Sequence, residues 1–516
     1  MRKSLRRNYI FNVIYQILSI LIPIVTIPYL SRVLQPEAVG VLSYSESIVA
    51  YFTLFAVLGS AVYAQREIGK VQDDRSERSK AFWEIQIIRT VSSAVAIGAY
   101  LIYTFVVQTN LIICLILALE ILNVILDINW FFQGLEEFGK TVAVGLIVKI
   151  LNLIVIFVFV KSPSDLWIYA LSKCGFGVLG NLSLWLLLPK YLCKTEKIKP
   201  FRHLKEILMF FIPAIATQVY MILDKSMIGW FTVTREENGY YEYAERITRM
   251  TITIIAALAA VLIPRVSKAY AEGGIDSVRG IAHKAVTYVW LLALPICLGL
   301  LAVADVFVPI FLGDSYAKVV LLVQIFTPLV VFVGMANIIG LAFLIPINKQ
   351  RVYLVSVVIA AVVNLIMNLI LIPRFYSVGA AISSVTAEGV GIIIQVGYVF
   401  KKRLLSAKKF FLSAVKYLIS AAVMFAVVFV MKLFVLPTTV WGLVVLILLG
   451  VVVYLLGLLA LRDRILLDTA KKVISKFKKS GAVTENAESE NQEVAEQPPA
   501  ETEASEIESE QPSLLE

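Results

Sequence analysis

Hydrophobic runs of similar length follow one another along most of this chain. From residue 9 to residue 461, stretches of mostly apolar residues alternate with short polar segments. An α-helix of about 20 apolar residues crosses the roughly 30 Å of hydrocarbon in a bilayer, whereas the strands of a membrane barrel are about half as long and alternate in polarity. We therefore predict an all-α integral membrane protein with about 14 transmembrane helices, at residues 9–31, 39–64, 83–108, 110–132, 141–161, 166–189, 206–231, 239–264, 285–312, 317–345, 351–373, 378–400, 410–436 and 439–461.

One spacing of residues occurs in both halves of the chain. A glycine, a tyrosine, a glutamate and an isoleucine recur at the same intervals (Gly40, Tyr44, Glu46 and Ile48; Gly239, Tyr243, Glu245 and Ile247). Internal repeats in a membrane chain are typical of transporters whose two related bundles enclose a central path. We expect one lobe over residues 1–205 (helices one to six), a second over 206–409 (helices seven to twelve), and two further helices over 410–461.

Composition and charge support a membrane location and orient the chain. Apolar residues make up 59% and charged residues 16% of the sequence, against about 45–50% and about 25% in soluble domains. Of the 47 Lys and Arg residues, 34 fall on the side of the N-terminus, counting Arg351 at the first position of its span, and at most five fall in the opposite loops. This bias predicts that both termini are cytoplasmic. The net charge of +10 follows mostly from this bias, so no nucleic-acid partner is predicted. Residues 462–516 begin with a basic stretch and continue, after Lys479, into a tail with 11 glutamates that we expect to be cytoplasmic and disordered.

Charged residues inside the predicted helices are the main functional clue, since a charge at mid-membrane costs about 2.5–3.5 kcal/mol. Helix eight carries Glu242, Glu245, Arg246 and Arg249, whose spacing places all four on one face. One interpretation is two intrahelical ion pairs, Glu242 with Arg246 and Glu245 with Arg249. The other is that the arginines bind a phosphate group. The sequence supports both.

Further charges lie in other predicted helices of both lobes. Lys149 is near mid-depth in helix five, Arg89 is near the cytoplasmic end of helix three, and Lys173 is in helix six. Each either faces a polar cavity or extends to an interface. Asp224 and Lys225 are neighbours in helix seven, so they point in different directions and need separate partners.

Acidic residues at membrane depth are candidates for coupling transport to an ion gradient, because a desolvated carboxyl group can take a proton or bind Na⁺. For each of them, a structural salt bridge is the competing interpretation. The candidates are Glu46, Glu120, Asp127, Asp224, Glu245 and Glu388.

The cationic groups at membrane depth suit an anionic substrate such as a lipid phosphate or pyrophosphate. We therefore predict a substrate-binding set composed of Arg246, Arg249, Lys149, Arg89, Lys173 and Lys225. The chain has two histidines and no phosphate-binding loop, nucleophile elbow or metal-ligand spacing, so we expect no enzyme activity, no metal and no cofactor. Energy would come from an H⁺ or Na⁺ gradient, the membrane potential or downstream consumption.

Three segments of the chain have distinctive sequences. They are residues 28–34, residues 127–136 with the sequence DINWFFQGLE, and residues 223–247, which begin Leu-Asp-Lys and continue through Gly-Tyr-Tyr to Ala-Glu-Arg-Ile. These segments resemble the polysaccharide-transporter family, the Wzx-type oligosaccharide flippases. The likeness covers helices one to fourteen but not the tail.

The resemblance implies a fold of the multidrug/oligosaccharidyl-lipid/polysaccharide (MOP) exporter superfamily, with two six-helix lobes forming a V around a cationic cavity. It also implies an undecaprenyl-pyrophosphate-linked oligosaccharide as substrate, the bacterial cytoplasmic membrane as location, and a polysaccharide polymerase as the consumer of the exported unit. The polymer would be capsule, exopolysaccharide or a related wall polymer. Relatives that flip the peptidoglycan precursor carry arginines within helix one, and this chain has none between Arg7 and Arg32, which argues against that role.

Two other functions remain open at the level of sequence. A multidrug or cation antiporter of the same superfamily would need an anionic cavity, whereas the intramembrane charges here are mostly cationic. A membrane polymerase or ligase would need a large external loop with catalytic residues, and the predicted external loops have roughly ten residues or fewer.

Overall fold

The computed structural model describes residues 2–107, 110–195, 198–434, 439–463 and 465–467. Every regular element in this part of the chain is a helix, which confirms the predicted all-α class. Ten helical segments of the described chain are long and apolar enough to cross a membrane. Residues 1–454 form one compact unit and residues 455–516 another; most of the predicted tail lies outside the described residues.

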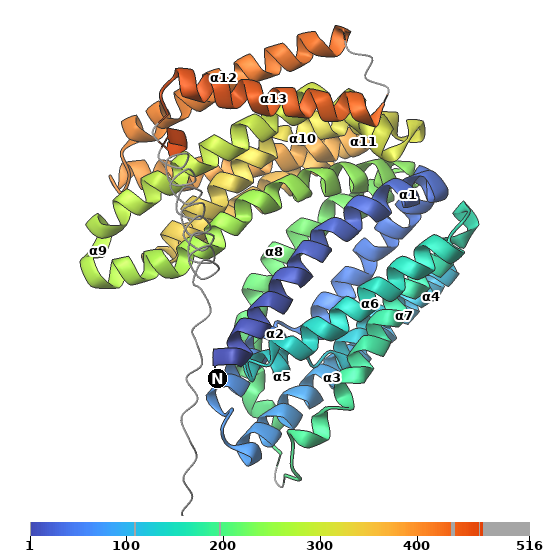
Figure 1. Cartoon of the computed structure of the whole chain (residues 1–516). Coiled ribbons are helices and arrows are strands. Elements are labelled where there is room, and N and C mark those ends of the chain that lie inside the picture. Colours follow the sequence, from blue (N-terminus) through green and yellow to red (C-terminus); the bar gives the residue numbers. More distant parts are fainter. Residues whose placement is uncertain (1, 108–109, 196–197, 435–438, 464, 468–516) are drawn as a thin grey trace, which may run out of the picture. The chain divides into compact units, whose positions relative to one another are not determined.

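The helices follow the order of the predicted spans (Figure 1). The α-helices are α1 (Arg2–Val57), α2 (Ser60–Lys70), α3 (Arg75–Val107), α4 (Leu111–Leu126), α5 (Asn129–Gly134), α6 (Phe138–Phe159), α7 (Leu166–Trp185), α8 (Leu204–Phe231), α9 (Glu236–Leu312), α10 (Ala317–Ala336), α11 (Gln350–Lys401), α12 (Ala407–Phe434) and α13 (Val440–Ala460). Short 3₁₀-helices are η1 (Pro163–Asp165), η2 (Leu188–Lys190), η3 (Pro200–His203) and η4 (Asp314–Tyr316), and a π-helical stretch, η5 (Asn337–Leu344), continues α10.

Three of the long helices contain a sharp break where the sequence predicts a loop between two spans. The backbone leaves the helical region at Gln35 in α1 (φ 62°), at Gly273 and Gly274 in α9, and at Tyr376 in α11 (φ 51°). Pro36 follows Gln35, and a residue before proline is driven out of the helical region. Each of these long helices therefore corresponds to two predicted spans, and the number of membrane crossings stays a prediction.

Two predicted spans are interrupted in the structure. The span 39–64 breaks at Leu58 and Gly59, where Gly59 is left-handed (φ 72°). The span 110–132 breaks at Asp127, whose side chain accepts a hydrogen bond from the backbone N–H of Asn129 at 3.0 Å. An aspartate that bonds the backbone two residues on forms a turn in place of a helix. Trp130 fixes this turn by donating its indole N–H to the carbonyl oxygen of Asp127 at 3.0 Å.

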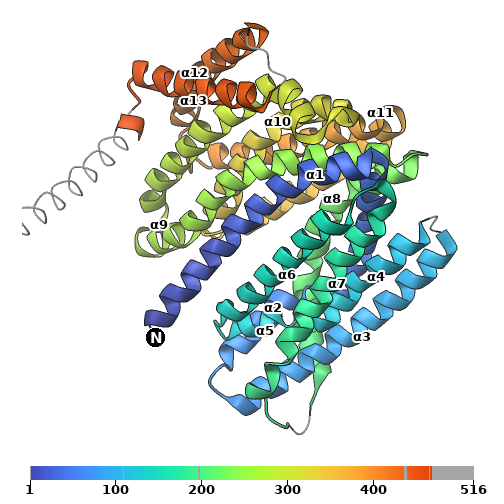
Figure 2. The same cartoon turned by 45° about the vertical axis from the view of Figure 1, so that its right-hand side comes forward.

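Packing within residues 1–454 groups helices that are near in sequence. In the first half α4 packs on α3 and α7, and α6 packs on α7, while in the second half α9 and α11 pack on α10 and α12 packs on α9 (Figure 2). α1 contacts both groups, since it packs on α3, α4 and α6 and also on α8 and α9. The boundaries of the predicted lobes stay a prediction. α1 packs on helices of both halves, and α8 of the second half also packs on α2 of the first.

The two halves meet closely around the break in α1. The guanidinium of Arg32 donates to the carbonyl oxygen of Ile310 at 2.6 Å, and the backbone N–H of Arg235 donates to Glu37 at 2.8 Å. The repeated glycines Gly40 and Gly239 lie against each other here. A Cβ on Gly40 would collide with the carbonyl oxygen of Arg235, and a Cβ on Gly239 would collide with that of Pro36. Close backbone approach therefore explains why both positions are glycine.

A buried ion-pair network fixes the segment that leads into α8. Glu84 of α3 is fully buried and lies 2.7 Å from Arg202 and 2.9 Å from His203. The hydroxyl of Tyr63 hydrogen-bonds the other ring nitrogen of His203 at 2.6 Å. Because an unpaired buried carboxylate is costly, these contacts tie η3 to α2 and α3.

Candidate functional site

The four charged residues near the start of α9 form the ion pairs that their spacing allows. Glu242 accepts a hydrogen bond from Nε of Arg246, and Glu245 accepts one from Nε of Arg249 at 2.7 Å. Residues four apart in a helix lie one above the other on the same face. The structure therefore contains both intrahelical ion pairs that the spacing predicts. Whether the arginines can also bind a phosphate depends on the N–H groups that these pairs do not use.

Lys225 of α8 joins the two pairs into one cluster. Its ammonium lies 2.6 Å from Glu242 and 2.9 Å from Glu245. From the first half of the chain, the hydroxyl of Ser43 donates to Glu242 at 2.9 Å. We call Lys225, Glu242, Glu245, Arg246 and Arg249 the ionic cluster. It contains three cations and two carboxylates, and it lies where α1, α8 and α9 meet.

The ionic cluster exposes its arginines and buries its carboxylates. The side chains of Glu242 and Glu245 are 6% and 13% exposed, whereas those of Arg246 and Arg249 are 38% and 50% exposed. Within the described chain, the two terminal nitrogens of Arg246 make no hydrogen bond. Because Nε is bound to the carboxylate, the terminal N–H groups are oriented and remain available to an anionic ligand.

Asp224 precedes Lys225 in sequence, but its hydrogen-bond partners are all uncharged. It is buried and accepts hydrogen bonds from Tyr241 at 2.5 Å, from Asn368 at 2.6 Å and from Ser384. Asn364 lies next to this group, accepting from Asn368 at 3.1 Å. The two neighbours thus have separate partners, as helix geometry requires.

Glu388 lies near Asp224 and shares its lack of a cationic partner. The hydroxyl of Tyr220 donates to Glu388 at 3.1 Å. Both carboxyl groups border a cavity of about 130 Å³ that Arg249 and Glu245 also line. Neither Asp224 nor Glu388 forms a salt bridge within the described residues. The other predicted coupling candidates do, because Glu46 and Glu120 pair with Lys173, Asp127 with Arg89, and Glu245 with Lys225 and Arg249.

The predicted substrate-binding residues of the first half lie apart from the arginines of α9. Lys173 of α7 lies 2.6 Å from Glu46 and 3.3 Å from Glu120. Lys149 of α6 donates to the hydroxyl of Ser19 in α1 at 2.5 Å. Within the described chain, no contact joins either lysine to Arg246 or Arg249.

Arg89 is enclosed by protein. It is 1% exposed and donates to the hydroxyl of Ser60 and the carbonyl oxygen of Val124, both at 2.9 Å. One terminal nitrogen also lies 3.5 Å from Asp127. A substrate could reach this guanidinium only after rearrangement of the surrounding helices, so we leave Arg89 out of the site proposed below.

Sequence reasoning missed the uncharged residues that complete these sites. Tyr241, Asn368 and Ser384 surround Asp224, and three asparagines of the first half, Asn123, Asn129 and Asn181, form a hydrogen-bonded row. The feature of the sequence that could have identified these residues is the presence of amide and hydroxyl side chains inside apolar runs. They cost less in a membrane than charges do, so they stand out less.

Comparisons with known proteins identify the family. The model of the family described as "Polysaccharide biosynthesis protein" matches residues 5–270, more than half of the chain. The "Putative O-antigen transporter" of Escherichia coli (strain K12) is 23% identical over 414 residues, which are 78% of this chain and 98% of that protein. A second relative, from Haloferax volcanii, is named as a glycan biosynthesis flippase and is 27% identical over 188 residues, 36% of this chain and 39% of that protein.

Solved structures show the same fold at low sequence identity. "Lipid II flippase MurJ, inward closed conformation" has a TM-score of 0.71 at 16% identity and covers 89% of this chain and 100% of its own. An inward-facing multidrug resistance MATE family transporter of the MOP superfamily has a TM-score of 0.60 at 14% identity, covering 74% of this chain and 94% of its own. At these identities the likeness shows the fold alone. The match of the family model over more than half of the chain shows that the chain belongs to the polysaccharide biosynthesis protein family.

Proposed function

We propose that this protein is a flippase that carries lipid-linked oligosaccharides across the bacterial cytoplasmic membrane, with both termini in the cytoplasm. The substrate is an undecaprenyl-pyrophosphate-linked repeat unit, and the product serves a polymerase that builds capsule, exopolysaccharide or a related surface polymer. Membership of the family supports this proposal, as do the names of the relatives, an O-antigen transporter and a glycan biosynthesis flippase.

The orientation of the two arginines carries the proposal. Buried Glu242 and Glu245 hold Arg246 and Arg249 in place while the guanidinium groups remain 38% and 50% exposed. A guanidinium presents paired donors that match phosphate oxygens. Lys225 adds a third cation to two carboxylates, so the cluster has an excess of positive charge for a pyrophosphate. Lys149 and Lys173, from the first half, would contact the substrate after rearrangement of the two halves.

Transport would proceed by alternating access. In the structure the contacts of Arg32 and Arg235 join the halves at the end that the charge distribution assigns to the exterior. Breaking these contacts and forming others at the cytoplasmic end would change the side of the membrane from which Arg246 and Arg249 are accessible. The polyprenyl chain would remain in lipid, since only the head group needs a polar route.

Asp224 and Glu388 are the proposed coupling residues. Each carboxyl is surrounded by hydroxyl or amide groups and has no cationic partner among the described residues. A proton or Na⁺ would therefore neutralise an otherwise uncompensated charge. The cavity that they border, about 130 Å³, is smaller than the roughly 300–1,000 Å³ of small-molecule sites, so it suits an ion better than a drug.

The test is to replace both arginines. Arg246→Gln/Arg249→Gln removes the charged donors but retains polar side chains of similar length, so we expect a deletion strain carrying this variant to lose its surface polysaccharide. The amount of variant protein in the membrane fraction should equal that of the wild type. The measurement is surface polysaccharide by immunoblot or by sugar analysis.

The matched control removes two charges from the same helix outside the site. Arg265 and Lys268 of α9 are both exposed, and Arg265→Gln/Lys268→Gln should leave polysaccharide unchanged. Normal polymer from the Arg246/Arg249 variant, or equal loss in the control, would refute the assigned phosphate site.

A further inference from the structure

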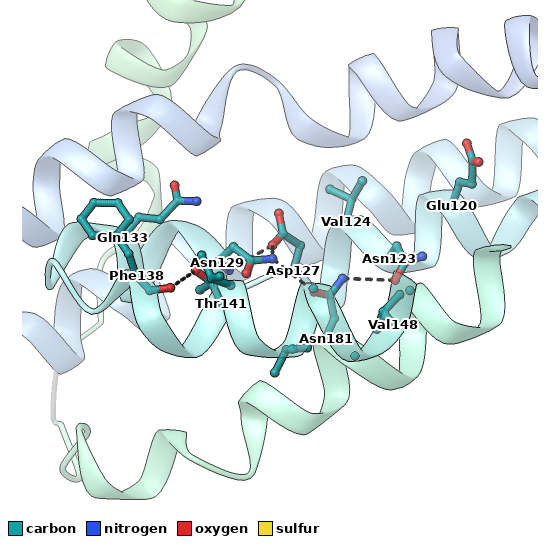
Figure 3. Close-up of a pocket in the computed structure, with 15 residues that line it drawn as sticks. Glu120, Asn123, Val124, Asp127, Asn129, Gln133, Phe138, Thr141, Val148 and Asn181 are labelled. Carbon is teal, nitrogen blue, oxygen red and sulfur yellow. Dashed lines mark hydrogen bonds between the residues drawn. The ribbon is translucent and has the colours of Figure 1, made fainter. Parts of the chain in front are cut away.

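The first half of the chain contains a polar pocket that is separate from the ionic cluster. This cavity, of about 590 Å³, lies between α4, α5, α6 and α7 and is partly open. Four amide side chains line it, those of Asn123, Asn129, Gln133 and Asn181, and we call it the amide pocket (Figure 3). Its volume falls within the roughly 300–1,000 Å³ of small-molecule sites.

A row of hydrogen bonds fixes three of these amides. Asn129 donates to Asp127 at 2.6 Å and to Asn181 at 3.3 Å, and Asn181 donates to Asn123 at 3.2 Å (Figure 3). The turn at Asp127 that interrupts the predicted helix is what places Asn129 in this row. An amide can accept two hydrogen bonds and donate two, so the row retains capacity for a ligand.

Gln133 is the amide that has no partner in the described chain. It lines the pocket from α5, and Thr141 lines it from α6. Phe138 and Val148 add apolar surface to the same wall. A pocket of fixed amides, one unpaired amide and an apolar wall matches a molecule with hydroxyl groups at its edge and C–H groups on its face.

The charges around the pocket exclude a phosphate as its occupant. Two carboxylates border it, and each has a cationic neighbour, since Glu120 lies 3.3 Å from Lys173 and Asp127 lies 3.5 Å from Arg89. Among the described residues that line the pocket there is no lysine or arginine. An uncharged ligand rich in hydroxyl groups fits this lining.

Ion pairs lead from the pocket toward the ionic cluster and end at a small gap beside it. Lys173, which contacts Glu120 at the pocket, also lies 2.6 Å from Glu46 of α1. Glu46 and Arg246 border the same small gap of about 20 Å³. A substrate with an anionic and an uncharged part can thus engage both regions, one after the other or together.

We propose that the amide pocket binds a sugar ring of the transported oligosaccharide, whereas the arginines of α9 bind its phosphate. This inference rests on the proposed function. It makes the first half of the chain the part that selects the glycan, because hydroxyl groups discriminate strongly where a site is built to bond them.

The experiment uses the purified full-length protein in detergent. Saturation-transfer NMR reports binding of four neutral sugars, namely glucose, galactose, rhamnose and N-acetylglucosamine. Gln133→Leu/Thr141→Val removes two polar groups at nearly constant volume without touching the asparagine row. We expect at least one sugar to give a signal with the wild type and that signal to be lost in the double variant.

The control changes a polar pair on two helices that border the pocket, at positions that do not line it. Ser172 of α7 donates to Asn152 of α6 at 2.7 Å, and Asn152→Leu/Ser172→Ala should retain the sugar signal. If the double variant of the pocket does not give a monodisperse protein, Gln133→Leu and Thr141→Val are tested singly, and each should weaken the signal. No signal from any of the four sugars with the wild type, or a signal that survives the pocket variants, overturns the inference.

Inorganic pyrophosphate separates this inference from the proposed function. Its ³¹P line should broaden with the wild type and with the pocket variants but not with Arg246→Gln/Arg249→Gln. Loss of sugar binding in the arginine variant alone would place the sugar at the ionic cluster and overturn the amide pocket. Failure of pyrophosphate to respond to the arginines would refute the phosphate site while leaving the sugar result intact.

Discussion

At the scale of single residues, neighbouring positions in this protein have opposite environments. Lys225 contacts two carboxylates, whereas Asp224 contacts only hydroxyl and amide groups. Each charged side chain of the ionic cluster has an oppositely charged partner within the cluster, so none of them pairs with Asp224. Burying the carboxylate of Asp224 costs free energy, and no cation among the described residues offsets that cost. Ionisable groups that are buried in a membrane at such a cost mark functional sites.

Replacing Asp224 tests whether it couples transport to an ion gradient. Asp224→Asn keeps the shape of the side chain but removes the charge that an ion would neutralise. In proteoliposomes, flipping of a fluorescent lipid-linked sugar by the wild type should be stimulated by an imposed Na⁺ or proton gradient by about 5-fold or more, the lower end of typical coupling between sites. We expect this stimulation to disappear in the variant.

Asp305→Asn is the matched control for that measurement. Asp305 pairs with Lys432 at 2.8 Å and is 47% exposed, so its loss should leave the stimulation unchanged. A gradient response of Asp224→Asn equal to that of the control would show that the ion acts elsewhere.

The sequence predicted the charged part of the site better than its uncharged part. The spacing of Glu242, Glu245, Arg246 and Arg249 determines their common face, because four residues make about one helical turn. Which other helices approach that face depends on tertiary packing, so the partners of Lys225 and the burial of Arg89 did not follow from sequence. The amide row could not be predicted either, since it needs the turn at Asp127.

At the scale of elements, the breaks in the long helices determine where the two halves touch. Gln35 redirects α1, and the segment that follows it brings Gly40 against Gly239. The sequence repeat drew attention to both glycines but did not show that they meet. Their contact needs two backbones at close approach, which is a property of the assembled helices.

Adding a methyl group at this contact should separate the halves. In Gly40→Ala the Cβ would collide with the carbonyl oxygen of Arg235, so the population should shift toward a state open at this end. Ser47 is buried and accepts a hydrogen bond from Ser226 at 3.0 Å, and Ser47→Cys in a protein without other cysteines reports the opening. We expect its labelling by a membrane-impermeant maleimide to rise about tenfold, equivalent to about 1.4 kcal/mol.

Gly98→Ala serves as the comparison for that labelling. Gly98 lies in α3, where an added Cβ would meet no atom within 4 Å beyond its own turn of helix, so the change adds the same methyl group without a collision. Equal labelling of Ser47→Cys in the two backgrounds would mean that the glycine contact does not hold this end closed.

At the scale of the whole molecule, the class of fold could be predicted because the length of apolar runs reflects the thickness of a bilayer. The internal repeat predicts two lobes, and the excess of lysine and arginine on one side predicts cytoplasmic termini; both stay predictions. The division of the chain into helices agrees with α1, α9 and α11, because each of them breaks where a loop is predicted between two spans. The breaks inside the predicted spans 39–64 and 110–132 were not predicted. Glycine and proline mark such breaks, but only packing determines whether the chain turns or continues.

The most direct measurement determines the leaflet in which lipid-linked oligosaccharides reside when the protein is missing. The gene is deleted, spheroplasts are prepared, and the intermediates are exposed to an impermeant sugar-oxidising enzyme before and after the membrane is opened. A flippase predicts repeat units that are protected until opening and that become accessible on complementation with the wild-type gene but not with Arg246→Gln/Arg249→Gln. A pool of lipid-linked intermediates that is unchanged in amount and in accessibility would contradict a role in flipping.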